Sequence, residues 1–463
     1  MISRTTIDQV YETARVEEVI GDFVALKKSG SNYKGLSPFS QERTPSFMVS
    51  PVKQIWKDFS SGKGGNVVAF LMEHEHFSYP EAIRFLAKRY NIEIEETEQT
   101  QEEKEKANAK ESLYLVNQYA KEAFEKDLWE FSEGMAIGLS YFRERGFTDE
   151  TIRFFGLGYA AEKKDHFYQK ALKAGYSEEY LVGTGLVIKN EHGEVDRFRG
   201  RVIFPIRSMA GRVQGFGGRI LSNTAKTAKY LNSPESEVYH KSQVLYGIFE
   251  SKKAIAKEDI CFLVEGYTDV IQLFQSGIEN VVSSSGTALT PEQIRLIRRL
   301  TSNIVVLFDG DAAGLRAAIR GVDLILEQGM NVKICSFPEG EDPDSFAKSH
   351  TEEEIKSYLK TEAKDFIEFK TDILLKEADK DPVKKAATVR EIVQSISKIP
   401  DAIQQEIYIK QCAEAMEVSE PVLFNALAQE QNKKQKPVRK IATPTGEQET
   451  PSHKMPQQHV ASH

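Results

Sequence analysis

The sequence predicts a multidomain protein of mixed α/β and α+β class, with a parallel-sheet α/β unit in its second half. Two uniformly apolar runs of strand length, Cys261–Val264 and Asn303–Phe308, are each followed by acidic residues and glycine. Continuous apolar runs of this length suit strands that are covered on both faces, as in a parallel sheet. Between them, Thr290 followed by Pro291 and Gln293 predicts a helix start with a capping box. The predicted order is therefore strand, helix, strand.

Acidic side chains follow both predicted strands. Glu265 comes directly after the first, and Asp309 and Asp311 come after the second, on the same side because they are two residues apart. The carboxyl ends of the strands are where open α/β sheets bind ligands. Carboxylates this close would repel one another, and their oxygens are the ligands that Mg²⁺ prefers. Asp342 and Asp344 follow a third strand-like run, so the sequence predicts a site for more than one metal ion.

The motif D-x-D-x-x-G that begins at Asp309 has other interpretations when it stands alone. A calcium loop is excluded because its fifth and twelfth positions are Ala313 and Arg320, which offer no side-chain carboxylate or carbonyl ligand. A phosphatase with an aspartyl nucleophile also has an apolar strand before D-x-D, but it needs no acidic motif on the neighbouring strands. The combination of acidic motifs therefore favours a metal site.

The resemblance to a known fold depends on four motifs in order. They are EGYTDV from Glu265, SSSGT from Ser283, FDGDAAG from Phe308 and GEDPD from Gly340. Together they resemble the metal-binding Toprim fold that bacterial primases and topoisomerases share. Four further segments, PFSQERTPSF, RGRVIFPI, GRVQGFGGR and KYLNSPE, narrow the resemblance to the bacterial replicative DNA primase family. It extends from about Ser3 to about Glu430.

This resemblance implies a template-directed ribonucleotide polymerase that makes short RNA primers on single-stranded DNA from ribonucleoside triphosphates. The mechanism expected is phosphoryl transfer assisted by two or more Mg²⁺ or Mn²⁺ ions. The expected direct ligands are Glu265, Asp309 and Asp311, with Asp269, Asp342 and Asp344 as secondary ligands or orienting groups. The loop Ser284–Thr287 is expected near nucleotide or metal.

Composition limits the other function classes. The chain has 463 residues, 40% of them hydrophobic, and a net charge of −8, which suits two to four domains and disfavours a uniform nucleic-acid coat. Its three cysteines, Cys261, Cys335 and Cys412, are too widely spaced for a disulfide framework or a C-x-x-C metal site. No leader or membrane-spanning run is recognisable, so a cytoplasmic protein is expected.

The predicted domain organisation has six parts. They are a zinc-ribbon-like template-recognition domain over 1–95, a linker over 96–112, the N-terminal subdomain of the polymerase core over 113–258, the Toprim subdomain over 259–350, a helical subdomain over 351–430 and a disordered tail over 431–463. Residues 95–112 contain no aromatic or large aliphatic side chain, so a solvated linker and an exposed, charged helix both remain open.

The first part is predicted to contain an amphipathic helix ending at Gly21, three strands over 23–28, 45–50 and 54–59, and two helices. In the resembled family this part is a zinc ribbon. Here the four ligand positions hold Ser37, Ser40, Asp58 and Ser61, so zinc is not expected. Apolar packing is the expected substitute, by Leu36, Phe39, Phe47, Ile55, Trp56 and Phe59.

A basic stretch runs from Arg197 to Lys241. It contains nine Arg and Lys side chains against only Glu235 and Glu237. Arg197, Arg199 and Arg201 alternate in a strand-like run, which would place three guanidinium groups on one face, toward the phosphates of single-stranded DNA. A solvated charged face is the alternative. The predicted DNA- or nucleotide-binding residues are Arg197, Arg199, Arg201, Arg219, Lys229, Tyr230, Asn232 and Lys241.

The C-terminal region is expected to lack one family feature. The family ends in a helical domain that grips the replicative helicase, and the polar residues after Glu430 cannot build such a domain. The helicase is therefore expected as a partner by resemblance, with its usual binding domain absent through truncation or a different arrangement. The alternative functions are a Toprim-type topoisomerase or nuclease and a non-catalytic binding module.

Overall fold

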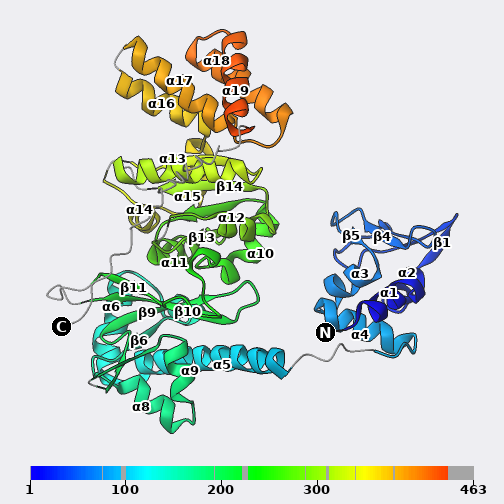
Figure 1. The fold of residues 1–463 in the computed structure, drawn as a ribbon, viewed down its shortest axis with the longest axis vertical. Coiled ribbons are helices and arrows are strands. Elements are labelled where there is room, and N and C mark those ends of the chain that lie inside the picture. Colours follow the sequence, from blue (N-terminus) through cyan, green and yellow to red (C-terminus); the bar gives the residue numbers. More distant parts are fainter. Residues whose placement is uncertain are drawn as a thin grey trace, which may run out of the picture. The chain divides into compact units, whose positions relative to one another are not determined.

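The computed structural model describes residues 2–75, 77–94, 101–191, 193–221, 228–286, 288–308, 312–338, 340–378 and 381–435. The chain forms two compact units, Met1–Ala109 and Lys110–His463 (Figure 1). The boundary between them falls inside the segment 96–112. The predicted limits of the smaller subdomains stay predictions.

The first unit packs four helices against one antiparallel sheet. The helices are α1 (Arg4–Thr13), α2 (Val16–Gly21), α3 (Val67–His74) and α4 (Tyr79–Arg89). The strands, in sheet order, are β1 (Lys27–Ser29), β2 (Asn32–Gly35), β3 (Phe47–Ser50), β4 (Ile55–Asp58) and β5 (Gly64–Gly65). Their apolar sides meet in a core built around the fully buried rings of Phe47, Trp56 and Phe70.

Two local predictions for this unit are wrong. The helix expected to end at Gly21 is two helices, because the backbone is extended at Ala14 and Arg15. The backbone N–H groups of Arg15 and Val16 donate instead to the Tyr90 hydroxyl and the Gln54 side-chain oxygen, both at 3.0 Å. The strand expected over 23–28 is ordered as a strand only from Lys27, and β2 was not predicted.

The long helix α5 (Gln101–Glu130) belongs to the second unit from Lys110 onward. Residues 101–112 are therefore helical, while 95–100 lie outside the described residues. Helical and turn segments follow: η1 (Gly134–Leu139), α6 (Ser140–Glu144), α7 (Asp149–Phe155), α8 (His166–Lys173), α9 (Glu178–Gly183) and η2 (Lys241–Gln243). The strands are β6 (Gly158–Ala160), the hairpin β7 (Val187–Asn190) and β8 (Gly193–Asp196), then β9 (Arg201–Arg207), β10 (Val213–Ile220) and β11 (Tyr230–Asn232). The order β11-β10-β9-β6 forms an antiparallel sheet.

The predicted α/β unit is confirmed. Its strands are β12 (Cys261–Val264), β13 (Val281–Ser283), β14 (Asn303–Phe308), β15 (Asn331–Ser336) and β16 (Lys364–Asp365). They lie in the order β13-β12-β14-β15-β16, and only β16 is antiparallel. Its helices are α10 (Ile248–Glu258), α11 (Tyr267–Gln275), α12 (Pro291–Arg298), α13 (Ala312–Glu327), α14 (Pro343–Ser349) and α15 (Glu352–Glu362).

The predicted start of α12 is also confirmed. The Thr290 hydroxyl accepts from the Gln293 N–H at 3.2 Å, and the Gln293 side chain accepts from the Thr290 N–H at 3.1 Å. The connection from β12 to β14 is nevertheless longer than predicted. It also contains α11 and β13, whose three residues are too few for a periodic signal.

Each face of the parallel sheet has its own apolar core. Leu263 and Val306 pack with α12 and α13 on one face, while Val264 and Val305 pack with α11 and α15 on the other. The helices α16 (Phe366–Ala378), α17 (Pro382–Ile396), α18 (Ala402–Met416) and α19 (Glu420–Gln435) extend the first of these cores (Figure 1).

Residues 431–435, expected as the start of the tail, belong to α19, and 436–463 lie outside the described residues. In the described part of the chain, no helix is both long enough and apolar enough to cross a membrane. The three cysteines are free and buried.

Candidate metal and nucleic-acid site

The carboxyl edge of the parallel sheet carries the predicted acidic residues. The parallel strands β12, β14 and β15 end at Val264, Phe308 and Ser336 on this one edge. Glu265 is exposed there, and its carboxylate has no hydrogen-bond or ion-pair partner among the residues that the structure describes. It lines a cavity of about 440 Å³ together with Ser284, Gly286, Leu289 and Arg320. Arg320, on α13, was not predicted to belong to the site.

Two of the three predicted direct ligands, Asp309 and Asp311, lie outside the described residues, as does Thr287 of the predicted loop. The strand that precedes them, β14, ends at Phe308. It is paired with β12, the strand that precedes Glu265. Among the described residues, no three His, Cys, Asp or Glu side chains are grouped so as to hold a metal ion. The convergence of the three carboxylates therefore stays a prediction.

The secondary acids have structural partners. Asp269 accepts from the Gly266 N–H at 2.9 Å and closes the first turn of α11. Asp342 caps α14 by accepting from the Ser345 N–H at 2.7 Å. These bonds fix the first turns of the two helices that begin at the carboxyl edge, and the metal-binding or orienting role of both acids stays a prediction.

Asp344 is buried at the same edge. One carboxylate oxygen pairs with Arg145 at 2.7 Å and Lys348 at 2.6 Å. The other oxygen, Oδ1, is buried without a partner among the described residues. Glu265 and this oxygen thus leave carboxylate acceptors available, and such hard oxygen ligands fit Mg²⁺ or Mn²⁺. Arg145, which follows α6, was missed by the sequence analysis because its partner lies 199 residues away.

Asn232 joins three of the sequence motifs. Its side-chain oxygen accepts from the Tyr267 hydroxyl at 2.7 Å, and its amide donates to the Ser285 carbonyl at 3.2 Å. Tyr267 in turn packs against β10 so closely that a Cβ on Gly217 would lie 2.5 Å from its ring. The glycines of GRVQGFGGR therefore allow the antiparallel sheet to approach the carboxyl edge. Asn232 holds the two sheets together at the site.

Four family models match successive parts of the chain. They describe a CHC2 zinc finger (residues 2–102), a DNA primase catalytic core, N-terminal domain (124–252), a Toprim-like domain (262–347) and a DnaB-helicase binding domain of primase (367–420). The DNA primase of Clostridium acetobutylicum is 36% identical over 432 residues, covering 92% of this chain and 70% of that protein. The DNA primase of Halalkalibacterium halodurans is 37% identical over 433 residues, covering 93% and 71%. This chain belongs to the bacterial DNA primase family.

Solved primase structures agree with this assignment. The zinc-binding and RNA polymerase domains of the Aquifex aeolicus primase align with a TM-score of 0.60 and 31% identity, covering 91% of this chain and 99% of that one. A DNA primase domain from Pseudomonas aeruginosa aligns with a TM-score of 0.62 and 34% identity, covering 68% and 99%.

The expectation that this primase lacks a helicase-binding domain is wrong. The family model of that domain matches residues 367–420, within α16–α19. The sequence analysis looked for such a domain after Glu430 and treated these helices as packing elements of the core. Their apolar side chains do pack in the core, and this packing is all that the periodicity of the sequence indicated.

The basic stretch differs from its prediction. Residues 197–200 form a turn in which Gly200 has φ +66°. Of the three alternating arginines, only Arg201 belongs to β9. The Arg201 side chain is 5% exposed and donates to the carbonyls of Gly218, Ala228 and Lys229 at 3.2–3.3 Å. The prediction of three guanidinium groups on one strand face is therefore wrong. Arg201 holds the chain before β11 and is not available for phosphate.

The other cations of this stretch fall into two groups, those paired with an acid and those without an acid partner among the described residues. Arg207 pairs with Glu250 at 2.9 Å and Arg212 with Glu111 at 2.7 Å, whereas Lys229 is exposed without a partner among the described residues. Arg197 donates to the Asn232 carbonyl at 3.5 Å, and its buried Nε has no partner there. Burial lowers the pKa of the Arg197 guanidinium, with no acid to oppose the effect. Positive charge beside β11 is therefore left uncompensated.

The remaining predicted binding residues lie on several different segments. Arg219 donates to the Tyr230 hydroxyl at 3.1 Å and lies 5.5 Å from the centre of that ring. The Lys241 N–H donates to Glu235 at 2.9 Å, and Arg199 is exposed in the turn before β9. These side chains stay predicted contacts.

One of the four zinc-ligand positions of the family, Asp58, is a buried carboxylate in this chain, and Ser37 and Ser61 of the other three bond to it. Asp58 is fully buried and accepts from the hydroxyls of Ser37 at 2.8 Å, Ser60 at 3.0 Å and Ser46 at 3.2 Å. It also accepts from the hydroxyl of Ser61 and, at 3.2 Å, from the Ser61 N–H. Burial alone would raise the pKa of Asp58, but these hydrogen bonds together lower it below its usual value.

The predicted apolar substitute for zinc is only partly correct. Phe39 and Phe47 both pack against the Trp56 indole, with ring centres 5.4 Å from it, and their own ring centres are 6.3 Å apart. Leu36 and Phe59, in contrast, are 48% and 68% exposed, and Ile55 is also exposed. Polar hydrogen bonds, which a hydropathy pattern does not display, surround the vacated positions instead.

Proposed function

We propose that this primase synthesises short RNA primers on single-stranded DNA at the carboxyl edge of β12, β14 and β15. Glu265, Asp309 and Asp311 are the proposed direct metal ligands, with Asp344 beside them. The observation that carries this assignment is the Glu265 carboxylate, which has no partner among the described residues, together with the uncompensated cations Arg197 and Lys229 next to β11. An acidic edge next to a basic surface separates metal binding from phosphate binding.

In this arrangement the residues of the chain have distinct tasks. Bound Mg²⁺ ions supply charge stabilisation for the reacting phosphate. Arg197 and Lys229 hold phosphates of template or nucleotide, and Asn232 keeps β11 in register with the loop at Ser285. Asp269 and Asp342 orient the helices that carry the acidic edge.

The direct test incubates the full chain with single-stranded DNA, labelled ribonucleotides and Mg²⁺. Short RNA products that depend on template are expected. Parallel reactions follow the relaxation of a supercoiled plasmid and the cleavage of a DNA strand. Either activity without RNA synthesis would favour the topoisomerase or nuclease alternative instead.

The proposed phosphate contacts of Arg197 and Lys229 have their own test. Arg197→Ala and Lys229→Ala are expected to weaken single-stranded DNA binding and to flatten its salt dependence. Each lost phosphate contact removes about 0.7 from the slope of log affinity against log salt. Arg212→Ala is the matched control, because Arg212 is already paired with Glu111. If the slope of log affinity against log salt in both variants equals that of the parent chain, Arg197 and Lys229 do not contact phosphate.

We further propose that the N-terminal unit folds around Asp58 without zinc. Serine hydroxyls are not zinc ligands, and both Asp58 oxygens already accept hydrogen bonds. The family model for this part is a zinc finger, but the donor set here does not fit that metal. The carboxylate and its hydroxyls thus connect the same loops that a metal would connect.

We also propose that α16–α19 contact the replicative helicase and that the protein acts in the cytoplasm. Ile403 and Ile407 are exposed and four residues apart on α18, so they share one face of the helix. Ile403→Asp with Ile407→Asp is expected to weaken co-purification with the helicase by at least tenfold, as loss of an apolar contact of this size would. Unchanged binding, with primer synthesis intact, would exclude this face.

A further inference from the structure

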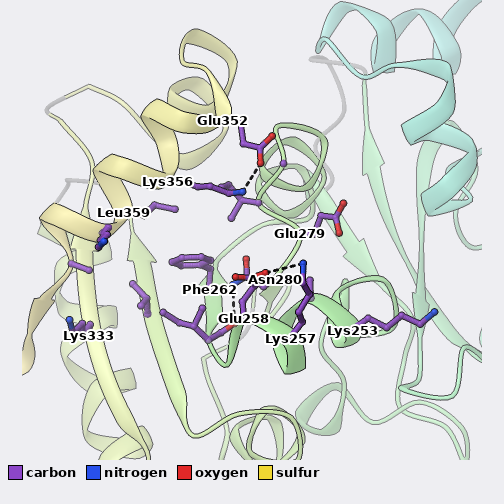
Figure 2. A pocket seen from close by; sticks show the side chains of 17 residues that line it. Lys253, Lys257, Glu258, Phe262, Glu279, Asn280, Lys333, Glu352, Lys356 and Leu359 are labelled. Carbon is purple, nitrogen blue, oxygen red and sulfur yellow. Dashed lines mark hydrogen bonds and ion pairs between the residues drawn. The ribbon is translucent and has the colours of Figure 1, made fainter. Parts of the chain in front are cut away.

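A second cavity in the described part of the chain lies away from the carboxyl edge. It has a volume of about 670 Å³ and lies between the second half of α10, the turn before β13, and α15. Its floor is the face of the parallel sheet formed by Phe262 and Val305 (Figure 2). A cavity of this size suits a small ligand.

Lysines dominate the polar lining of this cavity. Five lysines line it, against Glu258, Glu279 and Glu352: Lys253, Lys257, Lys333, Lys356 and Lys360. Lys257 pairs with Glu258 at 3.4 Å, and Lys356 with Glu352 at 2.5 Å. The other three have no ion-pair or hydrogen-bond partner in the described part of the chain. The cavity therefore has uncompensated positive charge.

The spacing of these lysines is unfavourable for the helices alone. Lys253 and Lys257 are four residues apart on α10, and Lys356 and Lys360 are four apart on α15, so each pair shares a helix face. Like charges at this spacing destabilise a helix. Elsewhere in the unit, lysines at this spacing face acids, as Lys121 faces Glu125 and Lys410 faces Glu406. An anion between the two helices would relieve the repulsion.

The floor adds an apolar surface at a defined distance from charge. Phe262, Val305 and Lys333 are register neighbours on adjacent strands, so their side chains lie on one face. Two strand spacings separate Phe262 from Lys333, or roughly 10 Å. Figure 2 shows Lys333 on one side of the Phe262 ring and Lys253 on the other. A flat ring over Phe262 therefore leaves its charged substituents within reach of lysines.

We propose that this cavity binds a nucleotide, with its phosphates on Lys333 and Lys360 and its base on Phe262. Lysine suits phosphate because it is a compact charge with three donors. Glu279, which is exposed and also lines the cavity, provides an acceptor for amino and hydroxyl groups. This site lies on the sheet face toward the amino ends of the strands, so it is separate from the proposed site of synthesis.

The test is calorimetric titration of the full chain with ATP in EDTA, which removes the metal that the carboxyl edge needs. One site is expected, and Lys333→Ala with Lys360→Ala should weaken it about tenfold or more, as loss of charge-assisted bonds does. Lys410→Ala is the matched control on an exposed helix, and Arg197→Ala with Lys229→Ala should also leave this site unchanged. Primer synthesis is expected to persist in the double lysine variant.

A second variant tests the ligand class. Phe262→Leu keeps the apolar floor but removes the flat ring, so it should weaken ATP several-fold while binding of inorganic tripolyphosphate stays unchanged. The proposal would be overturned if the parent chain bound no ATP. It would also be overturned if Arg197→Ala with Lys229→Ala abolished ATP binding while Lys333→Ala with Lys360→Ala did not. Equal losses for ATP and tripolyphosphate in Phe262→Leu would exclude a nucleotide as the ligand.

Discussion

Glu265→Ala is expected to reduce primer synthesis by at least about 100-fold, the usual effect of removing a charge-stabilising group from a reacting centre. Glu265 is exposed and has no partner among the described residues, so its removal leaves every described contact of the fold in place. Asp309→Ala is expected to have an effect of the same size, because both carboxylates would hold the same ions.

The control and the readout follow from the sheet. Glu279→Ala removes an exposed carboxylate from the turn before β13, at the opposite end of the strands, and should leave primer yield unchanged. Yield is measured with saturating template and ribonucleotides over a range of Mg²⁺ concentrations, with a thermal melt of each variant. A Glu265→Ala chain that retains activity within about tenfold of the parent would remove this residue from the metal site.

Asp58→Ala is expected to unfold the N-terminal unit or to destabilise it by about 3 kcal/mol or more. The change removes the buried carboxylate that accepts from four serine hydroxyls and one backbone N–H, and each hydrogen bond to a charged group contributes roughly 1.5–3 kcal/mol. Ser40→Ala is the matched control, because Ser40 is exposed and its hydroxyl contacts only Ser60 in the described region. It should change stability little.

The two tryptophans allow this unit to be followed within the full chain. They are Trp56 and Trp129, and Trp56 is buried in the N-terminal core. Fluorescence in a Trp129→Phe background therefore reports on the first unit alone. The melt should be insensitive to a chelator, and elemental analysis should find no zinc after growth with added zinc. About one bound zinc per chain, or a melt lowered strongly by the chelator, would contradict the role of Asp58.

The same network predicts acid sensitivity. Because the pKa of Asp58 is lower when folded than when unfolded, its contribution is complete above the unfolded pKa of about 3.9. It is lost as pH falls from there through the folded pKa. The Trp56 melt in the Trp129→Phe background should therefore be stable near neutral pH and fall below about pH 4. Asp58→Asn should reduce that fall without abolishing it, because the pKa of Glu42 in the same unit is also lowered.

Local patterns were enough to predict the centre of this molecule. The apolar runs at Cys261–Val264 and Asn303–Phe308 and the capping box at Thr290 depend on neighbouring residues, and all three form as expected. The acidic motifs follow those strands directly, so the edge that carries Glu265 was predictable from strand direction alone. The family followed from the combination of motifs, none of which is specific by itself.

Only the tertiary structure decided which polar side chains remain available. The sequence predicts that Arg201 is a surface cation, but the segment before β11 packs over it and buries it against three carbonyls. Asp344 reads as a metal ligand, yet one of its oxygens pairs with Arg145. Asp58 was interpreted as one of the vacated zinc-ligand positions, and in the structure it accepts hydrogen bonds from hydroxyls of two loops, the one before β3 and the one after β4. Charge and residue type are local properties, whereas burial and hydrogen-bond partners depend on segments distant in sequence.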